Sequence, residues 1–411
     1  MIKNKIKLSA LILIVTTTLV NCSDLNYNKF VNKIKKPTNS SETNNNYKAR
    51  WMAGSWGVTH RVNGGYKLDK SASKSNWQAG AKQIVKNIPA AKYVITSFTH
   101  PAHAYLFTLR TNENVDVASI HPDMVPSLKN EQIILDVIDI YRKAGKKIIL
   151  YLNAAGPSMA KSRRDPDIQK AWEKYYKTKW NGDEAAAWRN LVLGYAKRFN
   201  GLIDGYWLDN ARNLPGELSD FTAMLRSVDP SIVIGVNKGQ EYFKDKNNKF
   251  ILVDSDGLND KDKRDYKIVK HEINNQYTDF TSGHITPMRR GAPPSSWGYE
   301  EYTLRDMVKK PWGTYNGKKY GLKHGWFPIR DKWSGSTANL MFDLEKAYRF
   351  TRTITDGGAA ITWSTTQNKG YMTKDEMQIM TKISDKMMQN PKAKYKPYKR
   401  PKGAYLVGEK K

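Results

Sequence analysis

Asp209 is the first candidate for chemistry in this chain of 411 residues, because it directly follows the apolar run of residues 203–208. A carboxylate at the end of a buried strand can attack an anomeric carbon, form a glycosyl ester and leave again, as retaining glycosidases require. Aspartate is also a favoured helix N-cap, so position alone leaves a capping role open.

Polar, aromatic and imidazole side chains stand at the ends of similar apolar runs. We predict that they contact a substrate: His60, His100, His103, Asn153, Trp207, Asn237 and Trp363. Three arginines lie near these positions in the chain, Arg212, Arg289 and Arg290, and the planar guanidinium fork suits sulfate. Trp297 is added as a ring that can stack on a sugar.

The elements that must position these residues follow from hydrophobic periodicity. Strands are predicted over residues 52–58, 92–98, 147–153, 203–209, 232–237, 250–254 and 359–364, with an eighth near 324–329. Helices are predicted over residues 76–87, 131–144, 184–199, 218–228 and 374–388.

Repeated strand–helix units predict an α/β protein with one catalytic domain, a (β/α)8 TIM-like barrel. The active site of such a barrel lies at the carboxyl ends of its strands, where the polar residues above stand. An open doubly wound sheet is the alternative, but the first predicted strand is not followed by a glycine-rich phosphate loop.

The N-terminus indicates export. Three lysines precede an apolar run that is too short to span a bilayer, so residues 1–21 are predicted to be a signal peptide. Residues 19–22 resemble a bacterial lipobox, which makes Cys22 the predicted lipid anchor of a cell-envelope lipoprotein at the outer membrane or cell surface. An ordinary signal peptide with an incidental cysteine is the alternative. Cys22 is the only cysteine, so disulfides and cysteine metal sites are excluded.

The predicted organisation after the signal peptide has three parts. Residues 22–50 are rich in Asn, Lys, Ser and Thr and are predicted to be a disordered tether. Residues 51–390 form the catalytic domain. Residues 391–411 repeat Pro and Lys, which predicts an irregular basic tail wrapped on the domain surface.

The net charge of the chain indicates which kinds of partner it can bind. Lys and Arg number 68 against 39 Asp and Glu, which gives a formal net charge of +29. So basic a chain favours nucleic acid, an acidic membrane or a sulfated or carboxylated polysaccharide. An exported protein meets polysaccharide more often than nucleic acid, so we expect a sulfated polysaccharide substrate, no nucleic acid partner and a monomer.

Residues 254–262 carry oxygen ligands at alternate positions, as calcium loops do. The stretch lacks the terminal bidentate glutamate and contains lysines, so an Asx-rich turn is the alternative. We predict no required cofactor and no other metal site.

Several segments resemble the α-L-fucosidases of glycoside hydrolase family 29. Residues 202–209 are similar to the strand of that family with the pattern Asp-Gly-aromatic-Trp-aromatic-Asp, whose last Asp is the nucleophile, which implies this role for Asp209. Residues 91–100 resemble the strand that ends in a fucose-binding histidine pair, here separated into His100 and His103. Residues 54–57, 144–151 and 296–299 are also similar to fucosidase motifs.

The predicted acid/base residue differs from the acid/base residue of the fucosidases. Where they often carry Thr-Pro-Glu, residues 286–288 are Thr-Pro-Met, which is more similar to the endo-fucanases of glycoside hydrolase family 107. Those enzymes use a histidine as acid/base, which implies His284. An unperturbed histidine has a pKa of about 6.5, which suits a general acid near neutral pH. A loop histidine with only a structural role is the alternative.

Three glutamates remain as alternative acids. Glu272 is the first, because a carboxylate pair with Asp209 would suit any glycosidase. Glu300 and Glu301 come next, although they could be ordinary acidic residues in the first turn of a helix.

The resemblance implies a retaining, endo-acting glycoside hydrolase that cleaves α-L-fucosyl linkages in sulfated fucan. One alternative is a hydrolase of another sulfated marine polysaccharide, such as carrageenan or porphyran. Another is a glycan-binding surface lipoprotein without catalytic activity. An exported nucleic-acid binder has charge in its favour but no recognisable motif.

Overall fold

The computed structural model describes residues 47–163, 165–253, 266–285, 292–333 and 338–406. Its α-helices are α2 (Gly65–Ala72), α3 (Trp77–Asn87), α4 (Val117–Ile120), α5 (Leu128–Lys143), α6 (Pro166–Lys179), α7 (Glu184–Phe199), α8 (Leu218–Val228), α9 (Arg305–Lys309), α10 (Leu344–Asp356) and α11 (Lys374–Met388). Within these ranges no helix is both long and apolar enough to cross a membrane.

One sheet organises the molecule. Its strands are β1 (Trp56–Thr59), β2 (Tyr93–Ser97), β5 (Lys147–Asn153), β6 (Gly205–Asp209), β7 (Val233–Val236), β12 (Phe280–Thr281), β13 (Trp312–Tyr315), β14 (Lys319–Leu322), β15 (His324–Pro328) and β16 (Ala360–Ser364). The smaller strands are β3 (Thr99–His100), β4 (His103–Phe107), β8 (Glu241–Tyr242), β9 (Leu252–Val253), β10 (Tyr266–Lys267), β11 (Val269–Lys270), β17 (Gln367–Asn368) and β18 (Tyr371–Met372).

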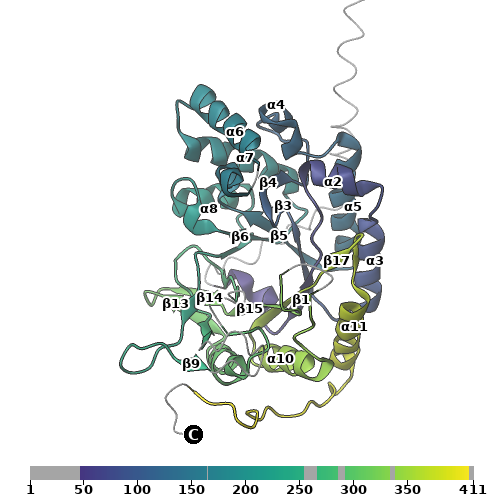
Figure 1. Ribbon diagram of the computed structural model, residues 1–411, viewed down its shortest axis with the longest axis vertical. Coiled ribbons are helices and arrows are strands. Elements are labelled where there is room, and N and C mark those ends of the chain that lie inside the picture. Colours follow the sequence, from purple (N-terminus) through teal and green to yellow (C-terminus); the bar gives the residue numbers. More distant parts are fainter. Residues whose placement is uncertain (1–46, 164, 254–265, 286–291, 334–337, 407–411) are drawn as a thin grey trace, which may run out of the picture.

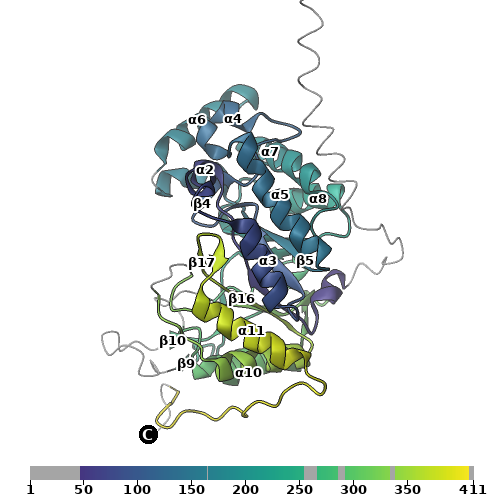
Figure 2. The ribbon, with the colours of Figure 1, turned by 90° about the vertical axis from the view of Figure 1, so that its right-hand side faces the viewer.

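The ten strands of this sheet follow the order β13-β14-β12-β7-β6-β5-β2-β1-β16-β15. Every neighbouring pair is parallel except β13 and β14. Parallel neighbours need a crossover, and α3, α5, α7 and α8 each connect two consecutive strands of the series. The sheet curls in the centre of the molecule with helices outside it, and α5, α3, α11 and α10 pack side by side in that order (Figures 1 and 2). The predicted α/β class with a strongly parallel sheet is therefore confirmed.

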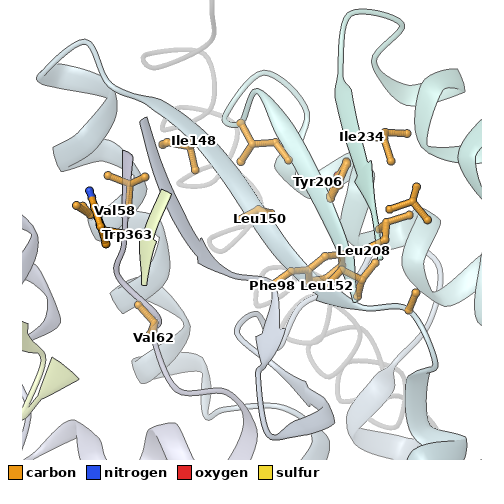
Figure 3. Close-up of a cluster of buried hydrophobic side chains, with 14 of the residues drawn as sticks. Val58, Val62, Phe98, Ile148, Leu150, Leu152, Tyr206, Leu208, Ile234 and Trp363 are labelled. Carbon is orange, nitrogen blue, oxygen red and sulfur yellow. The ribbon is translucent and has the colours of Figure 1, made fainter. Parts of the chain in front are cut away.

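Alternate residues of the strands face two different apolar clusters. Val58, Phe98 and Trp363 point outward into the cluster between the sheet and its helices (Figure 3). Tyr93, Ile149 and other strand residues belong to a second cluster on the concave side of the sheet. The period of two along a strand produces this division. Residues one position away from an outward-facing residue therefore face the inside of the curl.

The prediction that residues 250–254 form a strand of this sheet is wrong. Only Leu252–Val253 is extended there, and it pairs antiparallel with Tyr266–Lys267. The place beside β7 is taken by β12, which pairs with Gly235 and Val236. A strand of two residues is too short to show a period of two, so periodicity could not detect it.

The last described segment, residues 391–406, has little regular structure but packs on the domain, and it passes below α10 in both ribbon views. The carbonyl oxygen of Ala393 accepts hydrogen bonds from Tyr348 and Arg352 of α10, at 2.7 and 2.6 Å. Further along, Arg400 forms an ion pair with Glu301 (2.6 Å), and its guanidinium lies 4.4 Å from the ring centroid of Trp297.

Candidate active site

The carboxyl ends of three neighbouring strands bring predicted polar residues to one edge of the sheet. Asp209 is the last residue of β6 and is in register with Asn153, the last residue of β5. Asn237 directly follows β7, and its main-chain N–H donates to the Leu208 carbonyl over 2.8 Å. Parallel strands end at the same edge, so the three side chains lie together.

The Asp209 carboxylate is held by donors on both oxygens. The side-chain amide of Asn237 donates to Oδ1 over 2.8 Å, and the main-chain N–H of Asn210 donates to the same oxygen over 2.9 Å. The Tyr151 hydroxyl donates to Oδ2. These bonds fix the plane of the carboxylate, as a nucleophile that must meet one carbon atom requires.

The alternative role of Asp209 as a helix cap is not adopted. The short 3-10 helix that follows, Ala211–Asn213, has Asn210 at its N-cap position. Asn210 has a φ of 51°, in the left-handed region that asparagine tolerates better than most residues. The chain therefore turns immediately after Asp209, which leaves that carboxylate at the edge of the sheet.

His284 lies on the chain just beyond β12. Its ring stacks on Trp333 with the ring centroids 4.6 Å apart and also lies 6.1 Å from the Trp207 ring. The Nε2 amide group of Gln240 lies 2.9 Å from Nδ1 of His284. The nitrogen and oxygen of this amide can exchange places, and with Oε1 toward Nδ1 the amide accepts from Nδ1–H, which leaves Nε2 as the nitrogen that gives and takes a proton.

The position of His284 depends on the glycine before it. Gly283 has a φ of +67°, and a Cβ there would lie 2.6 Å from both the His324 carbonyl oxygen and the Trp326 main-chain nitrogen. The Trp326 N–H donates to the Gly283 carbonyl over 2.8 Å. A side chain at position 283 would therefore force the segment that carries His284 away from β15.

The electrostatics of His284 connect it to Asp209. Burial lowers the pKa of His284 below its ordinary value, and the Asp209 carboxylate acts in the opposite direction. A histidine whose pKa is moved in opposite directions by burial and by a fixed carboxylate can accept a proton and can return it. The two residues can therefore supply a nucleophile and an acid/base group to one site.

An aromatic floor lies beneath the two groups. Trp207 is 1% exposed, stacks on Tyr151 at 5.3 Å between centroids and meets Trp326 edge-on at 4.4 Å. Its indole N–H donates to the Ser282 carbonyl over 2.9 Å. Trp207 was predicted to contact substrate. It instead lies beneath the residues that form the site and supports them.

His100 and His103 lie in the β3–β4 hairpin near Tyr151, whose hydroxyl is 3.5 Å from the Pro101 carbonyl. His103 is engaged within the protein, because Nε2 lies 2.7 Å from the Lys67 ammonium and Nδ1 lies 3.3 Å from Asp165. Burial, and next the charges of His103, Lys67 and Arg61, lower the pKa of His100 to about 3. Nδ1 of His100 accepts from the Ala102 N–H, which leaves Nε2 as the nitrogen that donates.

Three predicted substrate contacts are corrected by burial. His60 is 0% exposed, and its ring nitrogens lie 2.8 Å from the Gly370 carbonyl and from the Tyr141 hydroxyl. Trp363 is 0% exposed and belongs to the outward-facing cluster. Trp297 is 2% exposed beneath Arg400. None of these rings is accessible to a sugar.

The amide residues at the strand ends serve mainly to position others. Asn153 is 2% exposed, receives the Ala155 N–H on its side-chain oxygen (3.3 Å) and donates its own N–H to Thr99 (3.0 Å). Asn237 orients Asp209 and accepts the Gly239 N–H over 3.2 Å. Both ends of the Asn237 amide are therefore occupied within the protein, and the side-chain oxygen of Asn153 accepts a main-chain N–H.

Arg212 is exposed, and its guanidinium donates to the Lys238 carbonyl over 2.8 Å. Arg289, Arg290, Cys22 and the possible calcium stretch of residues 254–262 lie outside the described residues. In the part of the chain that the structure describes, no group of three or more His, Cys, Asp or Glu residues could hold a metal ion.

The alternative acids are engaged in ion pairs. Glu272 pairs with Lys270, and Glu300 forms two bonds to Arg349 at 2.7 and 2.9 Å. Glu301 pairs with Arg400 at 2.6 Å and accepts from Tyr398. Of these, only Glu272 lines the same small cavity as His284. The geometry thus favours His284 as the acid/base group.

Sequence reasoning missed Tyr151 and Gln240, and it missed the contact of Trp333 with His284. Tyr151 lies two residues before the end of β5, on the same side of the strand as Asn153, so alternation from the strand end could have found it. Gln240 and Trp333 reach His284 from separate loops, and no local pattern indicates either contact.

Comparisons with known proteins agree with the resemblance to glycoside hydrolase family 107. The family model described as endo-alpha(1,4)-fucoidanase Mef1 matches residues 46–410. Among solved structures, the endo-fucoidan hydrolase P5AFcnA from glycoside hydrolase family 107 is 70% identical, with a TM-score of 0.87. That match covers 88% of this chain and 99% of P5AFcnA.

Two further endo-fucoidan hydrolases from family 107 share the fold. MfFcnA4 and MfFcnA9 are 16% and 15% identical, each with a TM-score of 0.63 over 84% of this chain. The matches cover 54% and 65% of those chains. A comparison with curated proteins gave no match.

Proposed function

The chain belongs to glycoside hydrolase family 107 and matches its endo-alpha(1,4)-fucoidanase group, and from this premise we propose that it cleaves α(1,4)-linked fucosyl bonds within sulfated fucan chains. As a family member it is a glycoside hydrolase. The net charge of +29 supports a polyanionic substrate. The observation that carries the mechanism is the fixed Asp209 carboxylate beside His284.

The proposed reaction retains the anomeric configuration. Asp209 attacks the anomeric carbon while the doubly protonated ring of His284 gives its Nε2 proton to the departing glycosidic oxygen, which breaks the bond and leaves a fucosyl ester on Asp209 and a neutral imidazole with its proton on Nδ1. His284 then takes a proton from water as the water oxygen attacks the same carbon, and Asp209 leaves as a carboxylate. Protonated His284 is regenerated for the next cycle.

The proposal extends to the architecture that holds these residues, an eight-stranded (β/α)8 barrel. Support comes from the parallel bridge between His284 and Trp326, which links the segment after β12 to β15. With that link, the parallel strands follow one another as β1, β2, β5, β6, β7, β12, β15 and β16, and β16 pairs with β1. Seven of these eight positions correspond to predicted strands.

Export and anchoring through Cys22 are part of the proposal. Support comes from the sequence of residues 1–22 and from the size of the substrate. A polymer of sulfated sugars is cut outside the cytoplasm, and an enzyme held at the cell surface keeps the products near the cell that releases them.

Product sizing tests the proposed function. Purified protein is incubated with fucoidan, carrageenan, porphyran and agarose, and products are sized during the first per cent of bond cleavage. We expect a rapid fall in fucoidan chain length with a ladder of oligosaccharides, and no change in the other polymers. Release of monosaccharide with polymer length preserved would contradict endo action. Binding of fucoidan without any cleavage would favour the glycan-binding alternative.

Gln240 provides a test of the acid/base assignment through pH. A general acid acts in its protonated form, so kcat/KM falls as pH rises through the pKa of His284. Gln240→Glu places a negative charge beside Nδ1, which raises this pKa, so the alkaline limb of the pH profile should move to higher pH. Gln240→Met should lower kcat/KM about 2- to 10-fold through loss of one hydrogen bond, without that upward movement. An alkaline limb that is unmoved in Gln240→Glu would argue against His284.

A further inference from the structure

The C-terminal segment, residues 391–406, contains six Lys and Arg residues and no Asp or Glu. Such a run of one charge is either a solvated surface or a surface that binds a polyanion. Which of the two applies depends on whether the protein fixes the positions of the charges and on what the charges face.

The inner side of the C-terminal segment packs on the domain. Ala393, Tyr395 and Tyr398 contact the apolar cluster between the sheet and its helices. The Tyr395 ring meets the Tyr348 ring edge-on, with 6.3 Å between the centroids. The Tyr398 hydroxyl donates to the Glu301 carboxylate over 2.8 Å. These contacts orient the segment, so one side of it faces the protein.

The main chain of the segment is also held along its length. The Lys396 N–H donates to the Glu345 carboxylate over 2.7 Å. Near the end of the segment, Leu406 forms an antiparallel bridge with Val253. A backbone that is ordered before binding loses less conformational entropy when a ligand binds. The charges of this segment can therefore bind more tightly than those of a flexible tail.

The outer side of the segment carries four exposed lysines, Lys394, Lys396, Lys399 and Lys402. Each of the first three directly follows one of the inward-facing residues named above. None of the four forms an ion pair with a carboxylate of the described residues, whereas Lys392 pairs with Asp356 at 3.0 Å. Their charges are thus directed to the outside of the protein.

The segment runs along α10 toward the edge of the sheet that carries the site. α10 leads back from the carboxyl end of β15 to the amino end of β16, so its first residues lie nearer the carboxyl edge. Lys392 pairs with Asp356, the last residue of α10, whereas Lys396 contacts Glu345, the second. From Lys392 to Lys396 the segment therefore passes toward the edge at which Asp209 lies.

The far end of the segment meets the strands that border His284. Leu406 bridges to Val253 of β9, and β9 pairs with β10. The chain continues directly from β10 into β11, whose Lys270 lines the small cavity beside His284. Both ribbon views place the end of the segment near β9 (Figures 1 and 2). The exposed lysines thus form a line of positive charge that leads along the side of the domain to the rim of the site.

A sulfated polysaccharide fits this line better than a membrane does. It is a linear polyanion whose charges repeat along its length, so it can meet cations that follow one another. A protein that binds a membrane surface usually inserts apolar side chains beside its basic residues. No large apolar side chain in the described part of the segment is exposed, and Tyr395 and Tyr398 face the protein.

We propose that Lys394, Lys396, Lys399 and Lys402 form a second binding surface for the sulfated fucan chain, outside the site at which the chain is cut. This assignment rests on the proposed function and adds to it a surface that holds sugars remote from the cleaved bond. Such contacts are the same before and during bond cleavage, so they lower KM for long chains and leave kcat unchanged.

A quadruple variant tests the surface, with Lys394→Gln, Lys396→Gln, Lys399→Gln and Lys402→Gln. KM for the fucan polymer should rise about 5- to 30-fold, because each exposed charge contact contributes modestly, and kcat should stay within about twofold of the wild type. The shortest oligosaccharides that the enzyme cuts do not reach both surfaces. Their kcat/KM should change less than about twofold.

The matched control removes four other exposed lysines that form no ion pair with a described carboxylate. They lie on α3, before β2 and on α5, and each is changed to Gln: Lys82, Lys86, Lys92 and Lys129. Both quadruple variants have the same net charge, so a general attraction of a polyanion to a basic protein would weaken equally in both. We expect the control to keep a polymer KM within about twofold of the wild type and both variants to keep the wild-type Tm.

Salt gives a second readout. The screening length falls to about 3 Å near 1 M salt, so the polymer KM values of the lysine variant and the wild type should converge as sodium chloride is raised. Equal rises of KM in the two quadruple variants, or a rise on oligosaccharides as large as on the polymer, would overturn the surface. An unchanged polymer KM with lost binding to vesicles of anionic lipid would also overturn it and would assign the lysines to a membrane.

Equilibrium binding separates this proposal from the proposed function. The full chain with Asp209→Asn, alone and combined with each set of four substitutions, is retarded in gels that contain sulfated or chemically desulfated fucan. We expect the variant of the C-terminal segment, but not the control, to lose about 5- to 30-fold in affinity for the sulfated polymer. If the wild type cleaves no fucan, the proposed function fails, while this loss still supports the surface. If fucan is cleaved and both quadruple variants bind alike, the surface fails and the proposed function stands.

Discussion

Asp209→Asn is expected to lower the turnover of fucoidan by at least about 10⁴-fold while binding of the polymer stays close to that of the wild type. An amide is too weak a nucleophile to form the fucosyl ester. The substitution should preserve the fold, because the amide oxygen can accept from Asn237 and Asn210. The amide NH2 would then face the Tyr151 hydroxyl, which can turn and accept.

The experiment has a matched control and a chemical rescue. Asp220→Asn changes an exposed carboxylate whose contact with Arg189 is 3.7 Å long, and it should behave as the wild type. Asp209→Ala leaves room for azide, which should restore turnover and yield a fucosyl azide of inverted configuration. Retention of more than a few per cent of activity in Asp209→Asn, with contamination excluded, would remove Asp209 as the nucleophile.

His284→Ala is expected to lower kcat on fucoidan by about 10² to 10⁴-fold, the usual contribution of a general acid. Aryl fucosides with an activated leaving group, if the enzyme accepts them, need little protonation and should lose much less. The alkaline limb of the pH profile should disappear with the imidazole, since burial and Asp209 set the pKa of that group.

Glu272 provides the comparison for this experiment. Glu272 lines the same small cavity as His284, as Glu241 does, and Glu272→Gln removes its charge with little change in volume. It should retain most of the wild-type activity. If Glu272→Gln is inactive while His284→Ala turns over fucoidan normally, the roles of the two residues are reversed.

The sequence predicts the parts of the fold that are long and regular. Helices over residues 184–199, 218–228 and 374–388 and the strand over residues 147–153 have the predicted bounds, because each has enough residues to display its period. The helix Leu344–Asp356 was missed, and β12 was placed about 30 residues too early. β12 is stabilised by its pairing with β7 and β14 rather than by its own sequence.

Only the site residues that stand at the ends of predicted strands could be predicted from the sequence. Asp209 and Asn237 come together because parallel strands end at one edge. Whether an aromatic residue faces inward or outward depends on its phase in the strand. Trp207 shares the phase of Asp209, whereas Trp363 has the opposite phase and packs beneath the helices. Composition carries no information on phase.

Contacts between loops could not be predicted from local sequence patterns. Gln240 lies 44 positions from His284, and Trp333 lies on another segment again, yet both determine the orientation of the imidazole. Such contacts arise from the way the sheet curls, which brings the ends of distant strands to one place. His60 shows the converse, since a histidine at a strand end can be occupied entirely by its own protein.

The packing of the C-terminal segment has a practical consequence for shortening or extending this enzyme. A protein that ended at residue 390 would expose the indole of Trp297 and would leave Glu301 without the Arg400 charge. Residues 391–406 therefore belong to the folded catalytic unit even though they form no helix. Affinity tags, carbohydrate-binding modules or surface-display partners are best joined after this segment, with a spacer that leaves its contacts with α10 intact.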